Sequence, residues 1–144
     1  MEAVSARAAV CAHPTALATC LRAAAVAQPR EACGLLLGRT AGRCGTVTQA
    51  VELANRAASD ERFELDAREH LATELDAARR GLSVLGTWHS HANGPATPSA
   101  LDEHGACAYP LAWIVGLEHG EALVRAYDTR ERPWRELALR MEPA

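Results

Sequence analysis

The chain contains no lysine: all 15 of its cationic side chains, among 144 residues, are arginine. A GC-rich genome, consistent with the abundant alanine, is the simplest cause, and avoidance of lysine as an acceptor for protein conjugation is the alternative. Apolar runs of the roughly 20 residues that a membrane helix needs are also absent. The early glutamate and interrupted apolar pattern of "MEAVSARAAVCAHP" make a poor secretory signal, so we expect a cytoplasmic protein.

Cysteine pairs at redox or metal-binding spacing are missing as well. The 5 cysteines are an odd number and none forms a CxxC pair, which argues against a disulfide framework or a cysteine-rich zinc knuckle. Most of them are expected to be small buried hydrophobic side chains. A net charge of -3 and a pI near 6.1 give no reason to expect nucleic acid or a membrane surface as partner.

Length and composition predict one folded domain, residues 1–144. Apolar residues make up 49% and charged residues 23% of the chain, which are ordinary values for a globular protein. Helical and strand patterns alternate and a run of strands follows, which predicts an α/β sandwich around a mixed sheet. The expected helices span residues 14 to near 29, 67–81 and 99–108, and the expected strands span 32–39, 45–53, 63–65, 82–89, 111–117, 122–128 and 134–141.

Two histidines lie at the end of an expected strand, in the stretch "GTWHSHANGPATPSALDEHGA" (residues 86–106). Side chains at i and i+2 share one face of a strand, so His89 and His91 project in parallel, while Trp88 and Ser90 point the other way. Two imidazoles on one face can converge on one metal ion. By itself, however, the HxH pattern is weak evidence for a metal.

The pair Ser99 and Asp102 has two interpretations. After Pro98 it fits a capping box, with Ser99 as the N-cap of a helix and Asp102 near position N3. Alternatively, the turn-forming segment "ANGPATP" doubles back and brings Asp102 to the histidines as a third ligand. The two roles do not exclude each other, because a carboxylate at the start of a helix can also face the end of a strand.

Two histidines and an aspartate leave a fourth coordination position open for water, as catalytic zinc sites do. Such a site needs a nearby base to take the proton from that water. Glu31 is the candidate, because it leads directly from a helix into the buried segment "CGLLLG"; a surface glutamate is the alternative. We do not expect the remaining histidines to join this site; they are His13, His70, His104 and His119.

His89, His91, Ser99 and Asp102 resemble, without gaps, the HxHx7Sx2D signature of the JAMM (JAB/MPN-type) zinc metalloproteases. The segment "PREACGLLLG" is similar to the part of that family that carries the catalytic glutamate, with Glu31 in its place. The resemblance covers nearly the whole chain. It implies a JAB/MPN-like three-layer sandwich, with a mixed β-sheet between helices, similar to the cytidine deaminase fold.

The resemblance also implies a role for each residue. His89, His91 and Asp102 would hold Zn²⁺. Glu31 would act as general base and then as general acid, and Ser99 would hydrogen-bond the oxyanion of the tetrahedral intermediate. Many members have proline after the second histidine where this chain has Ala92, a difference that affects the stiffness of the loop.

The expected activity is that of a zinc-dependent peptidase acting on the C-terminal tail of a small ubiquitin-like sulfur-carrier protein, after Gly-Gly. The chain is close to a minimal core of the family, and "HANGPATPSALD" resembles bacterial members that process sulfur carriers. The alternatives are an isopeptidase acting on ubiquitin-like conjugates and a non-catalytic scaffold, with a homodimer left open. A zinc deaminase is disfavoured because HxE and PCxxC motifs are absent. Four arginines late in the chain either contact an acidic surface of the carrier or form a solvated charged face: Arg125, Arg130, Arg132 and Arg135.

Overall fold

A computed structural model describes residues 9–41, 44–104 and 108–142 of the chain. The strands in these ranges are β1 (Ala9–Ala12), β2 (Cys33–Ala41), β3 (Cys44–Leu53), β4 (Ser83–Ser90), β5 (Leu111–Glu118), β6 (Glu121–Asp128) and β7 (Arg135–Met141). The helices are α2 (Pro14–Ala27), α3 (Ala67–Arg79) and α4 (Ala100–His104). Each long helix and strand predicted from the sequence is therefore present, within a few residues of its expected bounds.

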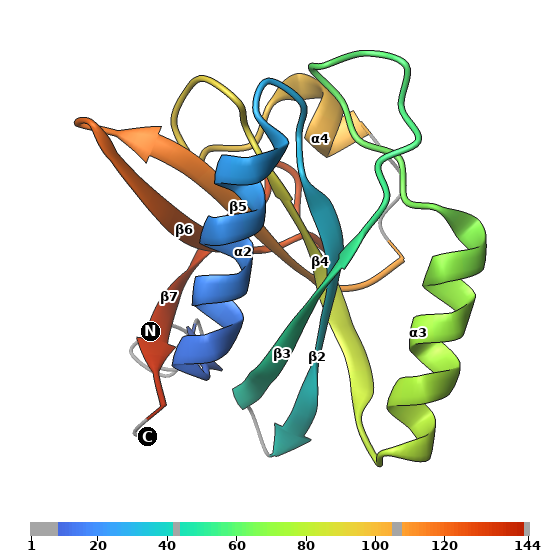
Figure 1. The fold of residues 1–144 in the computed structure, drawn as a ribbon. Helices are drawn as coiled ribbons and strands as arrows, with labels where there is room; N and C mark the ends of the chain where they lie inside the picture. The colour runs from blue at the N-terminus through green and yellow to red at the C-terminus, as the bar shows by residue number, and fades with distance from the viewer. Residues whose placement is uncertain (1–8, 42–43, 105–107, 143–144) are drawn as a thin grey trace.

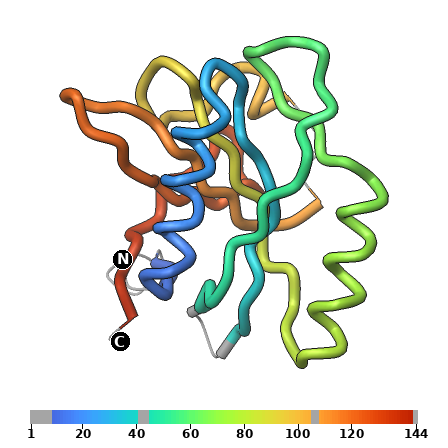
Figure 2. The backbone as a smooth tube through the Cα atoms, in the orientation of Figure 1, coloured from blue at the N-terminus to red at the C-terminus, as the bar shows by residue number. Residues whose placement is uncertain are grey.

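The strands form one mixed sheet in the order β1-β3-β2-β4-β5-β6-β7, and β1 closes it by pairing in parallel with both β3 and β7 (Figure 1 and Figure 2). The predicted mixed sheet with packed helices is confirmed. The three-layer description is met only in part, because the sheet curls until its edges meet. The closing strand was not predicted from the sequence, since the four residues of β1 carry no clear alternation and find both partners far along the chain.

The two long helices pack on opposite faces of the sheet. Neighbouring leucines of β2 point to alternate faces, as a strand requires. Leu36 belongs to the core beneath α2, together with Trp88 and Trp113, whereas Leu35 and Leu37 pack with Ala77 of α3. All five of these strand side chains are fully buried, so the apolar run of β2 is explained by helices on both of its faces.

Close packing of β2 against its neighbours depends on Gly34. A Cβ at this position would lie 1.8 Å from the Val51 carbonyl oxygen and 2.6 Å from the Trp88 indole nitrogen, so no side chain fits. The space instead lets Trp88 Nε1 donate a hydrogen bond of 3.1 Å to Val51 O, across the strand between them. This contact satisfies the polar atom of a fully buried tryptophan next to His89.

Some local expectations need correction. Residues 63–65 do not form a strand; within the described ranges they contribute a single bridge, Asn55 to Leu65. Leu71 and Leu75 of α3 are spaced as a helix requires, but they are 58% and 51% exposed, and Ala77 makes the buried contact instead. The helix expected over 99–108 is described as α4, and residues 105–107 lie outside the described part of the chain.

Among the cysteines whose side chains are described, the expected burial is confirmed for Cys20 and Cys33, whereas Cys11 is half-buried. Cys20 and Cys33 are fully buried, and with Cys11 they are free thiols. Burial raises the pKa of Cys33 to about 12, so its thiol stays protonated at neutral pH. The side chains of Cys44 and Cys107 lie outside the described part. None of the helices described here is long and apolar enough to cross a membrane.

Candidate metal centre

Three side chains converge just beyond the carboxyl end of β4. His89 Nε2 lies 3.1 Å from Asp102 Oδ1, and His91 Nε2 lies 3.1 Å from Asp102 Oδ2. The two imidazole Nε2 atoms are 3.3 Å apart. One ligand atom from each residue lies within 4.8 Å of the other two, which is the clustering that one small cation requires.

The end of β4 and the loop that follows it place His91 next to His89 and Asp102. His91 is the first residue after β4, and its backbone N–H still donates to Val115 O of β5, at 2.8 Å. The chain then turns back, so that Pro95 O accepts a hydrogen bond of 2.9 Å from His91 Nδ1. A proton held on Nδ1 leaves the Nε2 lone pair free for a metal, which is how metal-binding histidines are commonly oriented.

Asp102 reaches the histidines from the first turn of α4, and the capping box is also present. Ser99 N donates to Asp102 Oδ2 at 2.8 Å, and Asp102 N donates to Ser99 Oγ at 3.1 Å. The same carboxylate therefore accepts from the helix start and faces both imidazoles. The capping box and the approach of Asp102 to the histidines are therefore compatible, because they use different lone pairs of the carboxylate.

His89 is held by packing rather than by a second hydrogen bond. Its side chain is 1% exposed and stacks on Phe63, with ring centroids 4.5 Å apart. Its Nδ1 atom has no hydrogen-bond partner among the described residues. The sequence did not single out Phe63, because its contact with His89 spans 26 positions and follows from the loop before α3.

The charges of the cluster are arranged for a cation. Burial opposes ionisation of Asp102, but hydrogen bonds from both histidines hold its pKa below the usual value. Burial would likewise lower the pKa of His91, yet the hydrogen bonds to Asp102 and to Pro95 O raise it overall. Two nitrogen donors and one carboxylate, close together and shielded from water, fit zinc in the manner of a catalytic rather than a structural site.

Glu31 lies beside the cluster at the start of β2. Its side chain is buried, and Asn55 Nδ2 fixes its backbone by donating to Glu31 O at 2.9 Å. Burial raises the pKa of Glu31, and the facing charges of His89 and His91 oppose that shift. The alternative, a surface glutamate, is therefore wrong, and the carboxylate lies in restricted, partly desolvated surroundings of the kind in which general bases are found.

An open hollow of about 460 Å³ connects Glu31 to His91 and Ser99. Because Ser99 Oγ accepts from Asp102 N, its own proton remains available to donate into this space. The rim carries Asp60 and Glu61 from the loop after β3, with further lining from Pro29, Ala92, Asn93 and Leu101. The hollow thus brings His91 of the cluster together with the Glu31 carboxylate and the Ser99 hydroxyl group.

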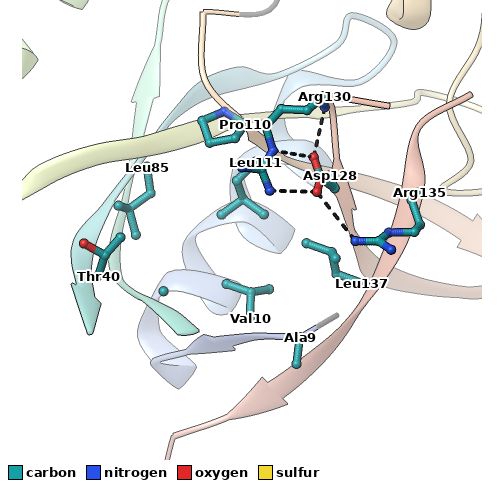
Figure 3. Close-up of a pocket in the computed structure, with 11 residues that line it drawn as sticks. Ala9, Val10, Thr40, Leu85, Pro110, Leu111, Asp128, Arg130, Arg135 and Leu137 are labelled. Carbon is teal, nitrogen blue, oxygen red and sulfur yellow. Dashed lines mark hydrogen bonds and ion pairs between the residues drawn. The ribbon is translucent and has the colours of Figure 1, made fainter. Parts of the chain in front are cut away.

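A larger hollow of about 530 Å³ lies at the opposite ends of the strands (Figure 3). Its walls are mainly apolar, with Val10, Leu85 and Leu137 pointing inward, and Asp128 at its edge is paired with Arg130. It contains none of the metal-ligand candidates. Size therefore does not identify the reactive site in this molecule, and the smaller hollow has the relevant chemistry.

The other histidines stay out of the cluster. His13 caps α2 by accepting from Thr15 N at 3.2 Å, and His70 hydrogen-bonds Tyr109 at 2.7 Å. His119 occupies the turn between β5 and β6 with a φ of 54°. His104, in α4, does not belong to the metal-ligand group either.

Known proteins are similar to this chain in both sequence and fold. Residues 13–134 match the family described as prokaryotic homologs of the JAB domain. A protein from Pyrococcus furiosus named desampylase is 34% identical over 63% of this chain, and the match spans 62% of that relative. A desampylase from Haloferax volcanii is 30% identical, over 79% of this chain and 80% of the relative.

Solved structures agree. A protein from Desulfitobacterium hafniense aligns with a TM-score of 0.84 at 30% identity, over 94% of both chains. One from Salinibacter ruber aligns with a TM-score of 0.66 at 32% identity, over 92% of both. A JAB1/MPN domain protein from Archaeoglobus fulgidus has a TM-score of 0.61 at 21% identity, over 94% of this chain and 99% of the other, and supports the fold alone.

We predict that the purified protein carries about one zinc ion per chain. His89→Ala, His91→Ala and Asp102→Ala should each lose it, because each removes one of three donor atoms. Elemental analysis after dialysis measures the occupancy. His70→Ala, which changes a histidine bonded to Tyr109, is the control and should retain zinc. Full occupancy in all three ligand variants would refute the assignment.

Proposed function

Because this chain belongs to the prokaryotic JAB family, we propose that it is a zinc-dependent peptidase that cleaves the C-terminal tail of a ubiquitin-like sulfur-carrier protein after Gly-Gly. The observation that carries the proposal is the grouping of His89, His91 and Asp102 around one point, beside a hollow that also exposes Glu31. In this function His89, His91 and Asp102 hold the metal, and Glu31 and Ser99 act on the substrate.

Zinc held by His89, His91 and Asp102 would supply a Lewis acid that activates water and polarises the scissile carbonyl group. Glu31 takes a proton from the attacking water and then delivers it to the nitrogen of the leaving group, so one carboxylate acts as base and as acid. Ser99 donates a hydrogen bond from its hydroxyl group to the carbonyl oxygen as negative charge develops there. The capping hydrogen bond from Asp102 N holds the Ser99 oxygen in place for this role.

The hollow supports a substrate with a thin tail. It is open to solvent, and its walls include Pro29 and Ala92 together with Leu101, which is 55% exposed. A Gly-Gly segment can approach such walls because it has no side chains. Leu101 offers apolar contact to the residues that precede the glycines.

Two relatives named desampylase favour a second candidate, the removal of a ubiquitin-like modifier from a conjugate. The chemistry of the site would be the same, since an isopeptide bond is also an amide. What differs is the leaving group, which would be a lysine side chain of another protein. The absence of lysine from this chain would then protect the enzyme from being conjugated itself.

The late arginines give little support to a basic docking surface. Arg125 binds Glu118 and Glu136, Arg130 binds Asp128, and Arg132 donates to Thr129 O. Arg135 lies 3.2 Å from Glu131. Because Arg125, Arg130 and Arg135 are paired with carboxylates of this chain, we propose that the carrier is recognised chiefly through its tail.

We predict that Glu31→Gln retains zinc but slows turnover by about 10²–10⁴-fold, because it removes the proton acceptor without touching a ligand. Glu64→Gln is the matched control, since it changes an exposed carboxylate that does not line the hollow and should leave the rate unchanged. Turnover would be measured on a cleavable carrier fusion. A near-normal rate for Glu31→Gln would mean that another base is at work. If neither the wild-type protein nor any variant cleaved the fusion, the non-catalytic scaffold would be favoured.

Ser99→Ala should retain zinc and lower kcat by roughly 10²–10³-fold, the usual effect of removing one oxyanion donor. It also removes a helix cap, which costs about 1 kcal/mol of stability. Thermal melts measured beside the kinetics separate the two roles. A lower melting temperature with an unchanged kcat would leave Ser99 with the capping role alone.

Two substrates decide between the candidate functions. One is a sulfur carrier extended by several residues past Gly-Gly, and the other is the same carrier joined through Gly-Gly to a lysine side chain. We expect the enzyme to trim the linear extension, with mass spectrometry locating the cut after the second glycine. Glu31→Gln serves as the blank for both reactions. Release from the lysine conjugate alone would instead establish the isopeptidase.

A further inference from the structure

Ala96, in the loop that joins β4 to α4, is held from both sides. This residue is fully buried. Its backbone N–H donates to Glu118 Oε2 of β5 at 3.1 Å, and its carbonyl accepts from the Tyr127 hydroxyl of β6 at 2.5 Å. Most residues of a connecting loop face water, so a loop residue with both backbone groups bound by side chains is unusual.

The Ala96 N–H belongs to the same peptide unit as the Pro95 carbonyl. A peptide unit is planar, and in the trans form its N–H and C=O point in opposite directions. Fixing the direction of the Ala96 N–H therefore fixes the direction of the Pro95 carbonyl. That carbonyl is the acceptor for His91 Nδ1, at 2.9 Å, so the orientation of a ligand imidazole depends on the hydrogen bond to Glu118.

Glu118 is itself held firmly. Arg125 donates to both of its carboxylate oxygens, from Nε at 2.9 Å and from a terminal nitrogen at 2.6 Å. Arg125 in turn donates to Glu136 Oε2 of β7, at 2.9 Å. The Glu118 side chain is only 14% exposed. A bidentate pair in this position leaves the carboxylate little freedom to turn away from the loop.

The loop can come this close because Gly116 has no side chain. A Cβ on Gly116 would lie 2.3 Å from Ala96 N and 2.5 Å from the Pro95 carbonyl carbon. Next to it, Leu117 N donates to Gly94 O at 2.7 Å. The end of β5 is therefore shaped to receive the peptide that accepts from His91.

We propose that Glu118 is a positioning residue of the metal centre: through the Pro95–Ala96 peptide it orients His91, while Tyr127 holds the next peptide unit through the Ala96 carbonyl. The role rests on the proposed metal site but is separate from the chemical step, since Glu118 touches neither a ligand nor the hollow. Partners of this kind behind a metal ligand typically contribute 10–100-fold to metal affinity or activity.

Metal affinity tests the proposal without relying on turnover. Glu118→Ala and Tyr127→Phe should each weaken cobalt binding by about 10-fold in competition with a chelator. In the cobalt-loaded protein, the exchangeable Nδ1 proton of His91 should give a shifted NMR signal that exchanges with water faster in both variants. Glu136→Ala is the matched control, because it removes the other carboxylate on Arg125 and leaves the loop contact intact.

The outcomes are distinct. Wild-type affinity and proton exchange in a folded Glu118→Ala protein would overturn the proposal, as would an equal loss in Glu136→Ala. If Glu118→Ala does not fold, Glu118→Met, which keeps the length of the side chain without its oxygen acceptors, and Tyr127→Phe decide, and wild-type behaviour in both would overturn it. A wild-type protein that binds no cobalt would contradict the metal site itself, and this role with it.

Discussion

Two imidazoles and a carboxylate lie within hydrogen-bonding distance of one another in a largely buried position, and the surrounding structure is organised to keep them there. Such a cluster is costly to desolvate unless its charges are matched. The side chains of the cluster match their charges only in part, because the single carboxylate of Asp102 faces both imidazoles. A divalent cation bound by the three side chains would complete it.

Each ligand is held by a different element of the fold. His89 belongs to β4 and is packed against Phe63, His91 is turned by the loop that β5 and β6 hold, and Asp102 is fixed by the cap of α4. The geometry of the cluster therefore depends on contacts from several separate parts of the chain. If Glu118 has the positioning role proposed above, changes in β5 or β6 will affect metal binding without altering the hollow.

The sequence predicted the features that depend on local geometry. His89 and His91 share a face because they are two positions apart, and Ser99 and Asp102 form a capping box because helix starts follow simple spacing rules. Features that depend on distant contacts were missed. These include β1, which closes the sheet through partners in β3 and β7, and the stacking of Phe63 on His89. Helical spacing likewise predicted α3, but it did not predict that Leu71 would be exposed.

Zinc held by two histidines and one aspartate is the central claim, and X-ray absorption at the zinc edge of the loaded protein tests it most directly. We predict only nitrogen and oxygen neighbours at about 2.0–2.2 Å, with the multiple scattering that imidazole rings give. The buried, protonated thiol of Cys33 should contribute nothing, since it bonds toward Leu53 O rather than toward the cluster. A sulfur neighbour at about 2.3 Å would place the metal on cysteine and contradict the account.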